Sequence, residues 1–211
     1  MVVNKLEVNR LSRSDLSRYN VIVLGGGSYQ ALGTAGAAQI KEFVQGGGTV
    51  VGIQNAINWL KSQNLVSVTY REVPDGEKKR RPYGAMTDDL FSLEIPGTIF
   101  EADLDISHPL GFGYRQSKIP VFRDGDLLLE PSKNLYATPL VYTQNPLLSG
   151  YLPRKYNGKM GGTAGIIVGS TGTGKIIMMA DNPNFREHWF GTNKLFANAI
   201  FFAKAINSMG T

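Results

Sequence analysis

The chain has 211 residues, of which 42% are hydrophobic and 18% charged, and its formal net charge is +5. This length suits one large domain, and this balance is that of an ordinary globular protein. The sequence contains no cysteine, which excludes disulfides, thiolate metal sites and a cysteine nucleophile. No apolar run reaches the roughly 20 residues of a membrane helix, and the first residues do not form a signal peptide. We therefore expect no membrane span in this chain.

The first third of the chain predicts alternating strands and helices. The β-branched run Val21–Leu24 ends in three glycines and is typical of a parallel strand covered on both faces. Residues 35–45 have helical periodicity, Thr49–Ile53 reads as a second strand, and residues 56–63 read as a second helix. Short glycine-rich connections between these elements predict the βαβ units of a doubly wound α/β sheet.

The middle of the chain, about residues 65–156, predicts a β-rich insertion or edge region of the same domain. Proline and glycine separate short alternating stretches there, with strand candidates at 66–70, 97–102, 119–122 and 137–142. Two further strands follow at 164–168 and 175–180, and a last helix runs from 192 or 193 to about 207. We predict a mostly parallel sheet with helices on both faces, in which Val21–Leu24, Thr49–Ile53 and the strand at 175–180 are central neighbours.

Two motifs suggest phosphate or nucleic-acid binding. Residues 169–175 fit the G-x-x-x-x-G-K pattern of a P-loop, but Ile176 stands where Ser or Thr is required, and a strand follows instead of a helix. We therefore favour a glycine-rich hairpin loop, with a nucleotide-binding domain as a rival. The basic run 78–81 has no aromatic platform or recognition helix, which favours a solvated loop and predicts no nucleic-acid partner.

The two histidines do not support a metal site. His108 lies near Asp103 and Asp105, but the other histidine, His188, is distant in the sequence, and zinc usually takes three or more protein ligands. We expect His108 to cap a turn before Pro109, and we expect no cofactor or metal in this chain.

Polar side chains follow two of the predicted strands, at the edge where open α/β sheets place their ligands. The small residues around Gln54 favour the sharp strand-to-helix turn of a nucleophile elbow. The loop after Val21–Leu24 could offer backbone N–H groups to an anion, although a plain turn is the alternative. The sequence predicts no catalytic residue, and the candidate ligand-binding positions are Gln54, Asn55, Asn182, Asn184, Arg186, Gly26, Gly27 and Ser28.

Three stretches carry a resemblance to a known family, namely residues 16–29, 107–114 and 181–202. Together they resemble the C-terminal class I glutamine amidotransferase-like domain of bacterial M14 zinc carboxypeptidases, notably those of Bacteroidetes-type bacteria, over about residues 11–207. The resemblance implies a flavodoxin-like fold. Active amidotransferase domains carry a nucleophilic Cys and a His-Pro-Glu at the two turns where this chain has Gln54, Asn182 and Asn184. Those side chains cannot serve as thiolate, general base or orienting carboxylate.

The resemblance implies a non-catalytic accessory domain within a longer, secreted or cell-envelope protein. Zinc would lie in the peptidase domain of the parent, because no His-x-x-Glu occurs here. The expected partners are that peptidase domain and, besides it, a peptide or glycan ligand. The first βα unit of the fold is expected to be partly missing. A rival is a hydrolase or transferase built on Asp181, His188 and Ser28, which requires a nucleophile and a base within hydrogen-bond reach.

Overall fold

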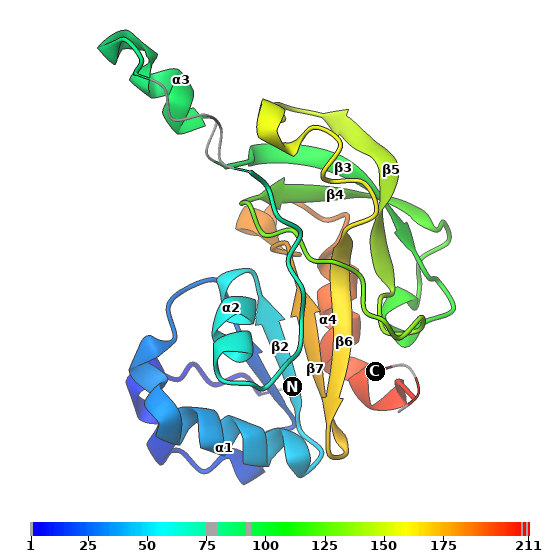
Figure 1. Cartoon of the computed structure of the whole chain (residues 1–211). Coiled ribbons are helices and arrows are strands. Elements are labelled where there is room, and N and C mark those ends of the chain that lie inside the picture. Colours follow the sequence, from blue (N-terminus) through cyan, green and yellow to red (C-terminus); the bar gives the residue numbers. More distant parts are fainter. Residues whose placement is uncertain (1, 75–79, 92–93, 208, 210) are drawn as a thin grey trace.

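The computed structural model describes residues 2–74, 80–91, 94–207, 209 and 211. Within them, one mixed seven-stranded sheet has the strand order β1-β2-β7-β6-β5-β3-β4 (Figure 1). The strands are β1 (Val21–Leu24), β2 (Thr49–Ile53), β3 (Pro96–Leu104), β4 (Lys118–Asp124), β5 (Leu140–Ser149), β6 (Ala164–Thr171) and β7 (Gly174–Met179). The α-helices are α1 (Gly33–Gln45), α2 (Asn55–Ser62), α3 (Met86–Phe91) and α4 (Asn193–Phe201).

The strands β1, β2 and β7 form the parallel part of the sheet, as neighbours. Every residue of β2 and β7 is buried, because helices cover both faces of these apolar strands. Val50, Ile176 and Met178 share a core with α1 and α2, whereas Val51 and Ile177 share a core with α4. Here the predicted α/β arrangement, with three neighbouring apolar strands, is confirmed, although β1 is an edge strand.

The prediction of a mostly parallel sheet is wrong for the other strands. From β7 onward, each neighbouring pair is antiparallel: β7 with β6, β6 with β5, β5 with β3, and β3 with β4. The first reversal follows from the turn Gly172–Thr173, because a two-residue connection can join only antiparallel strands. Residues 169–175 therefore form a hairpin, as favoured, and no helix follows them to complete a phosphate site.

The antiparallel strands extend the sheet and curl it into a half-barrel. Register shifts interrupt the pairing of β3 with both of its neighbours, and such bulges bend a strand. As a result β4, the last strand in the order, returns toward the carboxyl ends of β2 and β7 (Figure 1). This return brings side chains from opposite ends of the sheet order into contact.

Three predicted elements differ in extent. The strand at 66–70 is reduced to a single bridge between Tyr70 and Leu129. The strand predicted from residue 137 begins at Leu140, directly after Pro139, which has no N–H to donate to a ladder. The last helix ends at Phe201, because Phe202 leaves helical geometry at φ −115° and ψ 4°. Of the basic run 78–81, residues 78 and 79 lie outside the described part of the chain.

Candidate functional site

Gln54 occupies the sharp turn between β2 and α2. Its φ of 51° and ψ of −122° form a backbone conformation that residues with a side chain rarely adopt. The turn is held by its backbone N–H, which donates to the carbonyl oxygen of Met179 in β7 at 2.9 Å. Gly52 lets α2 approach the strand, since a Cβ there would lie 2.6 Å from Leu60 Cδ1. The geometry is thus that of the nucleophile elbow that the sequence predicts.

The side chain of Gln54 reaches across the sheet to Asp124 at the end of β4. Gln54 Nε2 donates to Asp124 Oδ1 at 2.9 Å and to the backbone oxygen of Asp124 at 3.1 Å. Burial raises the pKa of Asp124, and the hydrogen bond from Gln54 opposes that rise. Gly26 lies against the same amide, because a Cβ at that position would be 3.0 Å from Gln54 Oε1. The side chain of Gln54 therefore lies between the glycine loop after β1 and Asp124, and it contacts both.

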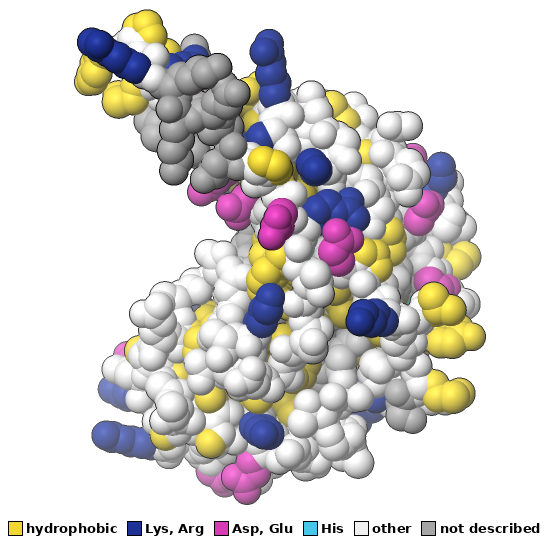
Figure 2. Space-filling model, viewed as in Figure 1, with side chains coloured by type: hydrophobic (Ala, Val, Ile, Leu, Met, Phe, Trp, Pro, Cys, Tyr) yellow, Lys and Arg dark blue, Asp and Glu magenta, His cyan; other side chains and the backbone are white. Residues whose placement is uncertain are grey.

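A hollow of about 420 Å³, which we call the elbow notch, opens beside Gln54. In Figure 2 the molecule is indented between the part that carries α2 and the part that carries β3 and β4, with acidic side chains along the edge of the latter. The residues that line the notch include three carboxylates and, among those described, no lysine or arginine. They are Gln54, Asn55, Glu94, Ile95, Pro96, Asp124, Gly125, Asp126, Leu127 and Ala180.

A buried ionic cluster holds the end of β4 in place. Arg123, only 1% exposed, lies with its Nη1 3.3 Å from Asp181 Oδ1 and donates to the carbonyl oxygen of Leu127. Tyr142 donates its hydroxyl to the other carboxylate oxygen of Asp181. Burial raises the pKa of Asp181 and Arg123 opposes that rise, while burial raises the pKa of Tyr142 far enough to keep its proton. Because Arg123 precedes Asp124, this cluster positions Asp124 beside Gln54.

The two asparagines after β7 form a turn of their own. Asn182 Oδ1 accepts from the backbone N–H of Asn184 at 3.1 Å, whereas the side-chain hydrogen bonds of Gln54 go to Asp124. Gln54 and Asn182 thus follow two adjacent strands, and Asn182 is three residues beyond Met179, whose carbonyl oxygen accepts from the Gln54 backbone N–H.

The charge of Arg186 acts on Asp124, which lines the notch. Its guanidinium lies 5.1 Å from the centre of the Phe185 ring, and the ring of Phe185 lies 4.3 Å from that of Phe122, on β4. The charge of Arg186 contributes to lowering the pKa of Asp124, against the larger effect of burial. Arg186 and Glu187 both have positive φ, at 47° and 58°. Among the other candidates, Asn55 lines the notch, Gly27 has a φ of 155°, and Ser28 is exposed in the loop after β1.

The two histidines that the metal and hydrolase alternatives require make structural contacts instead. His108 Nδ1 accepts from the backbone N–H of Leu110 at 3.1 Å, so this histidine caps a turn as expected, and burial lowers its pKa. The His188 ring packs against Phe122 and Phe185. In the part of the chain that the structure describes, no group of three or more His, Asp or Glu side chains is placed to hold a metal ion, and no helix has the length and apolar character to cross a membrane.

The sequence prediction missed the acidic side of this site. Arg123, Asp124 and Asp126 follow the strand candidate at 119–122 directly, and a charged Arg-Asp-Gly-Asp run at a strand end was the available signal. This run reaches Gln54 only because the curl of the sheet brings β4 back to β2. Local sequence patterns do not encode that curl.

No protein-family model matches the chain, and no curated protein matches it significantly. It is similar to the solved structure of a protein from Parabacteroides merdae described as ThuA-like, with a TM-score of 0.56 and 15% identity, over 92% of this chain and 74% of that one. A second such protein, from Bacteroides uniformis, has a TM-score of 0.47 and 14% identity, over 98% and 80%. A β-galactosidase from Bacillus circulans sp. alkalophilus matches 92% of this chain with 23% of its own, at 14% identity and a TM-score of 0.46.

The Parabacteroides likeness shows the fold alone, which is the glutamine amidotransferase-like α/β fold. Nothing in these comparisons links the chain to M14 carboxypeptidases. The chain thus combines this α/β fold with a glutamine at the turn between β2 and α2 and an acidic notch beside it.

Proposed function

We propose that this chain is a non-catalytic binding domain whose elbow notch accepts a lysine or arginine side chain. The basic side chain would come from a peptide ligand or from a neighbouring domain of the parent protein. The observation that carries the proposal is the pairing of an amide at the elbow with the carboxylates of Glu94, Asp124 and Asp126 around one hollow.

The elbow supports binding and not acyl transfer. The amide of Gln54 is neither a nucleophile nor a base at neutral pH. Its Nε2 is also engaged by Asp124, so the strained turn presents a fixed polar surface. Glutaminase and peptidase activities of this chain are accordingly expected at background.

The charge of the notch favours a cation. Glu94 and Asp126 come from different segments, yet both carboxylates act with burial, the largest cause, to raise the pKa of Tyr156 to about 12. Their fields thus meet at Tyr156, where Arg123 opposes them, and both carboxylates also line the notch. Glu94 and Asp126 are exposed, so each would gain only about 0.2–1 kcal/mol by pairing with a cation. A cationic side chain in the hollow would add the gains from several carboxylates.

The resemblance to the accessory domain of M14 zinc carboxypeptidases extends this proposal. It makes the partner the peptidase domain of the parent, which would hold the zinc, in a secreted or cell-envelope protein. The three sequence stretches that carry the resemblance support it. Sequencing the complete gene tests it: a His-x-x-Glu motif preceding this segment is expected, and a complete reading frame without one would refute the carboxypeptidase relation.

Binding is tested by isothermal titration of the whole chain with lysine-rich, arginine-rich and glutamate-rich peptides of equal length at two salt concentrations. Basic peptides should bind, more weakly at high salt, and the Glu94→Gln, Asp126→Asn double variant should lose at least about tenfold in affinity. Asp103→Asn, an exposed carboxylate of β3 outside the notch, is the matched control. Equal binding of glutamate-rich peptides, or no binding of basic peptides, would each overturn the proposal.

A further inference from the structure

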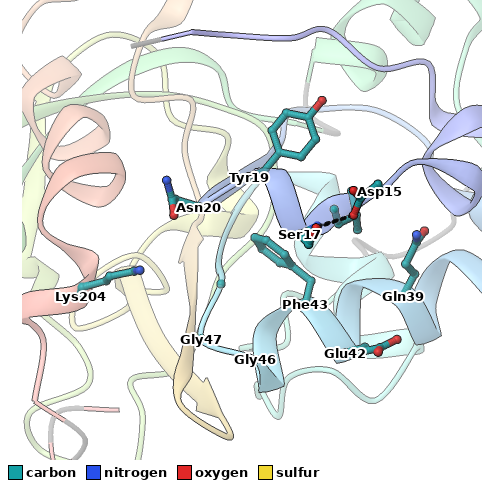
Figure 3. A pocket seen from close by; sticks show the side chains of 12 residues that line it. Asp15, Ser17, Tyr19, Asn20, Gln39, Glu42, Phe43, Gly46, Gly47 and Lys204 are labelled. Carbon is teal, nitrogen blue, oxygen red and sulfur yellow. Dashed lines mark hydrogen bonds between the residues drawn. The ribbon is translucent and has the colours of Figure 1, made fainter.

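A second hollow, of about 540 Å³, lies at the opposite edge of the sheet, where β1 and β2 begin. We call it the amino-edge hollow (Figure 3). It is formed by segments far apart in the sequence: the turn η2 (Leu16–Arg18), helix α1, the glycine turn after α1, and η8 (Ala203–Ala205) near the other end of the chain. Its lining residues are Asp15, Leu16, Ser17, Tyr19, Asn20, Gln39, Glu42, Phe43, Gly46, Gly47, Gly48 and Lys204.

The glycine turn gives the hollow a preformed floor. The N–H groups of Gly47 and Gly48 donate to carbonyl oxygens of α1 at 2.9 Å, and Gly47 has a φ of 100° that favours glycine. A Cβ on Gly48 would come within 2.4 Å of the Phe43 ring. The ring thus lies directly against the bare backbone of Gly48, and Phe43 also lines the hollow.

The walls combine aromatic surface with hydrogen-bond donors and hydrogen-bond acceptors. Phe43 supplies aromatic surface and Glu42 supplies a carboxylate, whereas the ring of Tyr19 points away from Phe43 in Figure 3. In Figure 3, Lys204 extends from the C-terminal segment toward Asn20 and Phe43. A second carboxylate, that of Asp15, accepts from the hydroxyl and the N–H of Ser17, and these bonds lower its pKa.

We propose that the amino-edge hollow binds a saccharide. A sugar ring has an apolar face, which suits Phe43, and hydroxyls that both donate and accept hydrogen bonds, which suit Glu42 and Lys204. An anion would meet the two carboxylates, and a purely apolar ligand would leave the polar groups without partners. The volume falls within the range of small-molecule sites. This site is independent of the elbow notch, because it lies at the other end of the parallel strands.

The test is an NMR titration of the ¹⁵N-labelled whole chain with cellobiose, maltose, lactose and the N-acetylglucosamine disaccharide. At least one sugar should shift amide signals of the glycine turn and of Asn20 while leaving those of Gln54 and Asp124 in place. Glu42→Ala should weaken that sugar at least about tenfold, as expected for a lost hydrogen bond to a charged group. Lys204→Ala should also weaken it. Lys41→Ala, the exposed neighbour of Glu42 on α1, should bind like the unaltered chain.

Phe43→Tyr and Phe43→Ala separate stacking from folding. The tyrosine variant keeps a ring over Gly48 and should retain binding, whereas the alanine variant should lose it, with folding of each variant checked from its spectrum. Failure of all four sugars to shift the glycine turn would overturn the proposal. Shifts that Glu42→Ala and Phe43→Ala leave unchanged would overturn it equally. None of these outcomes bears on the peptide titration at the elbow notch.

Discussion

Replacing Gln54 by glycine and by alanine should reverse the usual order of stability of these two residues. At an ordinary position, glycine makes a protein less stable than alanine by roughly 0.5–1 kcal/mol, because it loses more backbone freedom on folding. Gln54 has a φ of 51° and a ψ of −122°, a conformation that costs a residue with a Cβ about 1–3 kcal/mol. Glycine adopts it without that cost.

Both variants lose the hydrogen bonds from Gln54 Nε2 to Asp124, a common loss of about 1–2 kcal/mol for half-buried bonds. The difference between the variants therefore reports the backbone strain. We expect Gln54→Gly to be more stable than Gln54→Ala by up to about 2.5 kcal/mol, once the intrinsic preference for alanine is subtracted from the strain. Gln54→Ala should be less stable than the unaltered chain.

Urea unfolding, followed by far-ultraviolet circular dichroism, gives these free energies from the midpoint and slope. Lys41 in the middle of α1 is the matched control, since there Lys41→Gly should be less stable than Lys41→Ala by about 1 kcal/mol. If Gln54→Ala exceeds Gln54→Gly in stability by the roughly 0.5–1 kcal/mol of an ordinary position, the elbow is not strained and the reasoning fails.

Two further predictions concern the charges around Asp124. Arg123→Met leaves the Asp181 carboxylate buried without its cation and should lower the free energy of unfolding by about 3–5 kcal/mol. Adding Asp181→Leu to this variant should restore much of the lost stability. Strictly additive losses in the double-mutant cycle would contradict a coupled pair. Burial raises the pKa of Asp124, so the folded protein holds the carboxyl proton of Asp124 more tightly than the unfolded chain does. The contribution of Asp124 to stability therefore falls as pH rises from about 4, the usual pKa, through the raised pKa of the folded state. Asp124→Asn should therefore gain stability relative to the unaltered chain between pH 4 and pH 7. Asp15→Asn should show the opposite trend below about pH 4, because hydrogen bonds from Ser17 lower that pKa, and the stability that Asp15 contributes is lost as pH falls below the usual value. Urea unfolding at about pH 3, 4 and 7 measures both trends. A stability that changes with pH in the same way for the unaltered chain and for both variants would count against the reasoning.

Local patterns determined the parallel part of this protein. The β-branched runs of β1 and β2, and the apolar run of β7, are strands because such residues fit a buried pleated surface, and glycines end α1 and permit the turn at 172–173. The same patterns placed Gln54 at a sharp turn, since Gly52 and Ala56 allow strand and helix to approach closely. The absence of cysteine from the sequence by itself excludes a thiolate at that turn.

The tertiary structure alone decided where β4 lies and what faces Gln54. Pairing directions in the middle of the chain depend on contacts between distant segments, and an alternating strand reads the same whether its neighbour is parallel or antiparallel. The curl of the sheet then brings Arg123 to Asp181 and Asp124 to Gln54, across 58 and 70 positions of sequence. A charged residue after a short strand reads as solvent-exposed by itself; its burial, its partner and its raised pKa exist only once the half-barrel has formed.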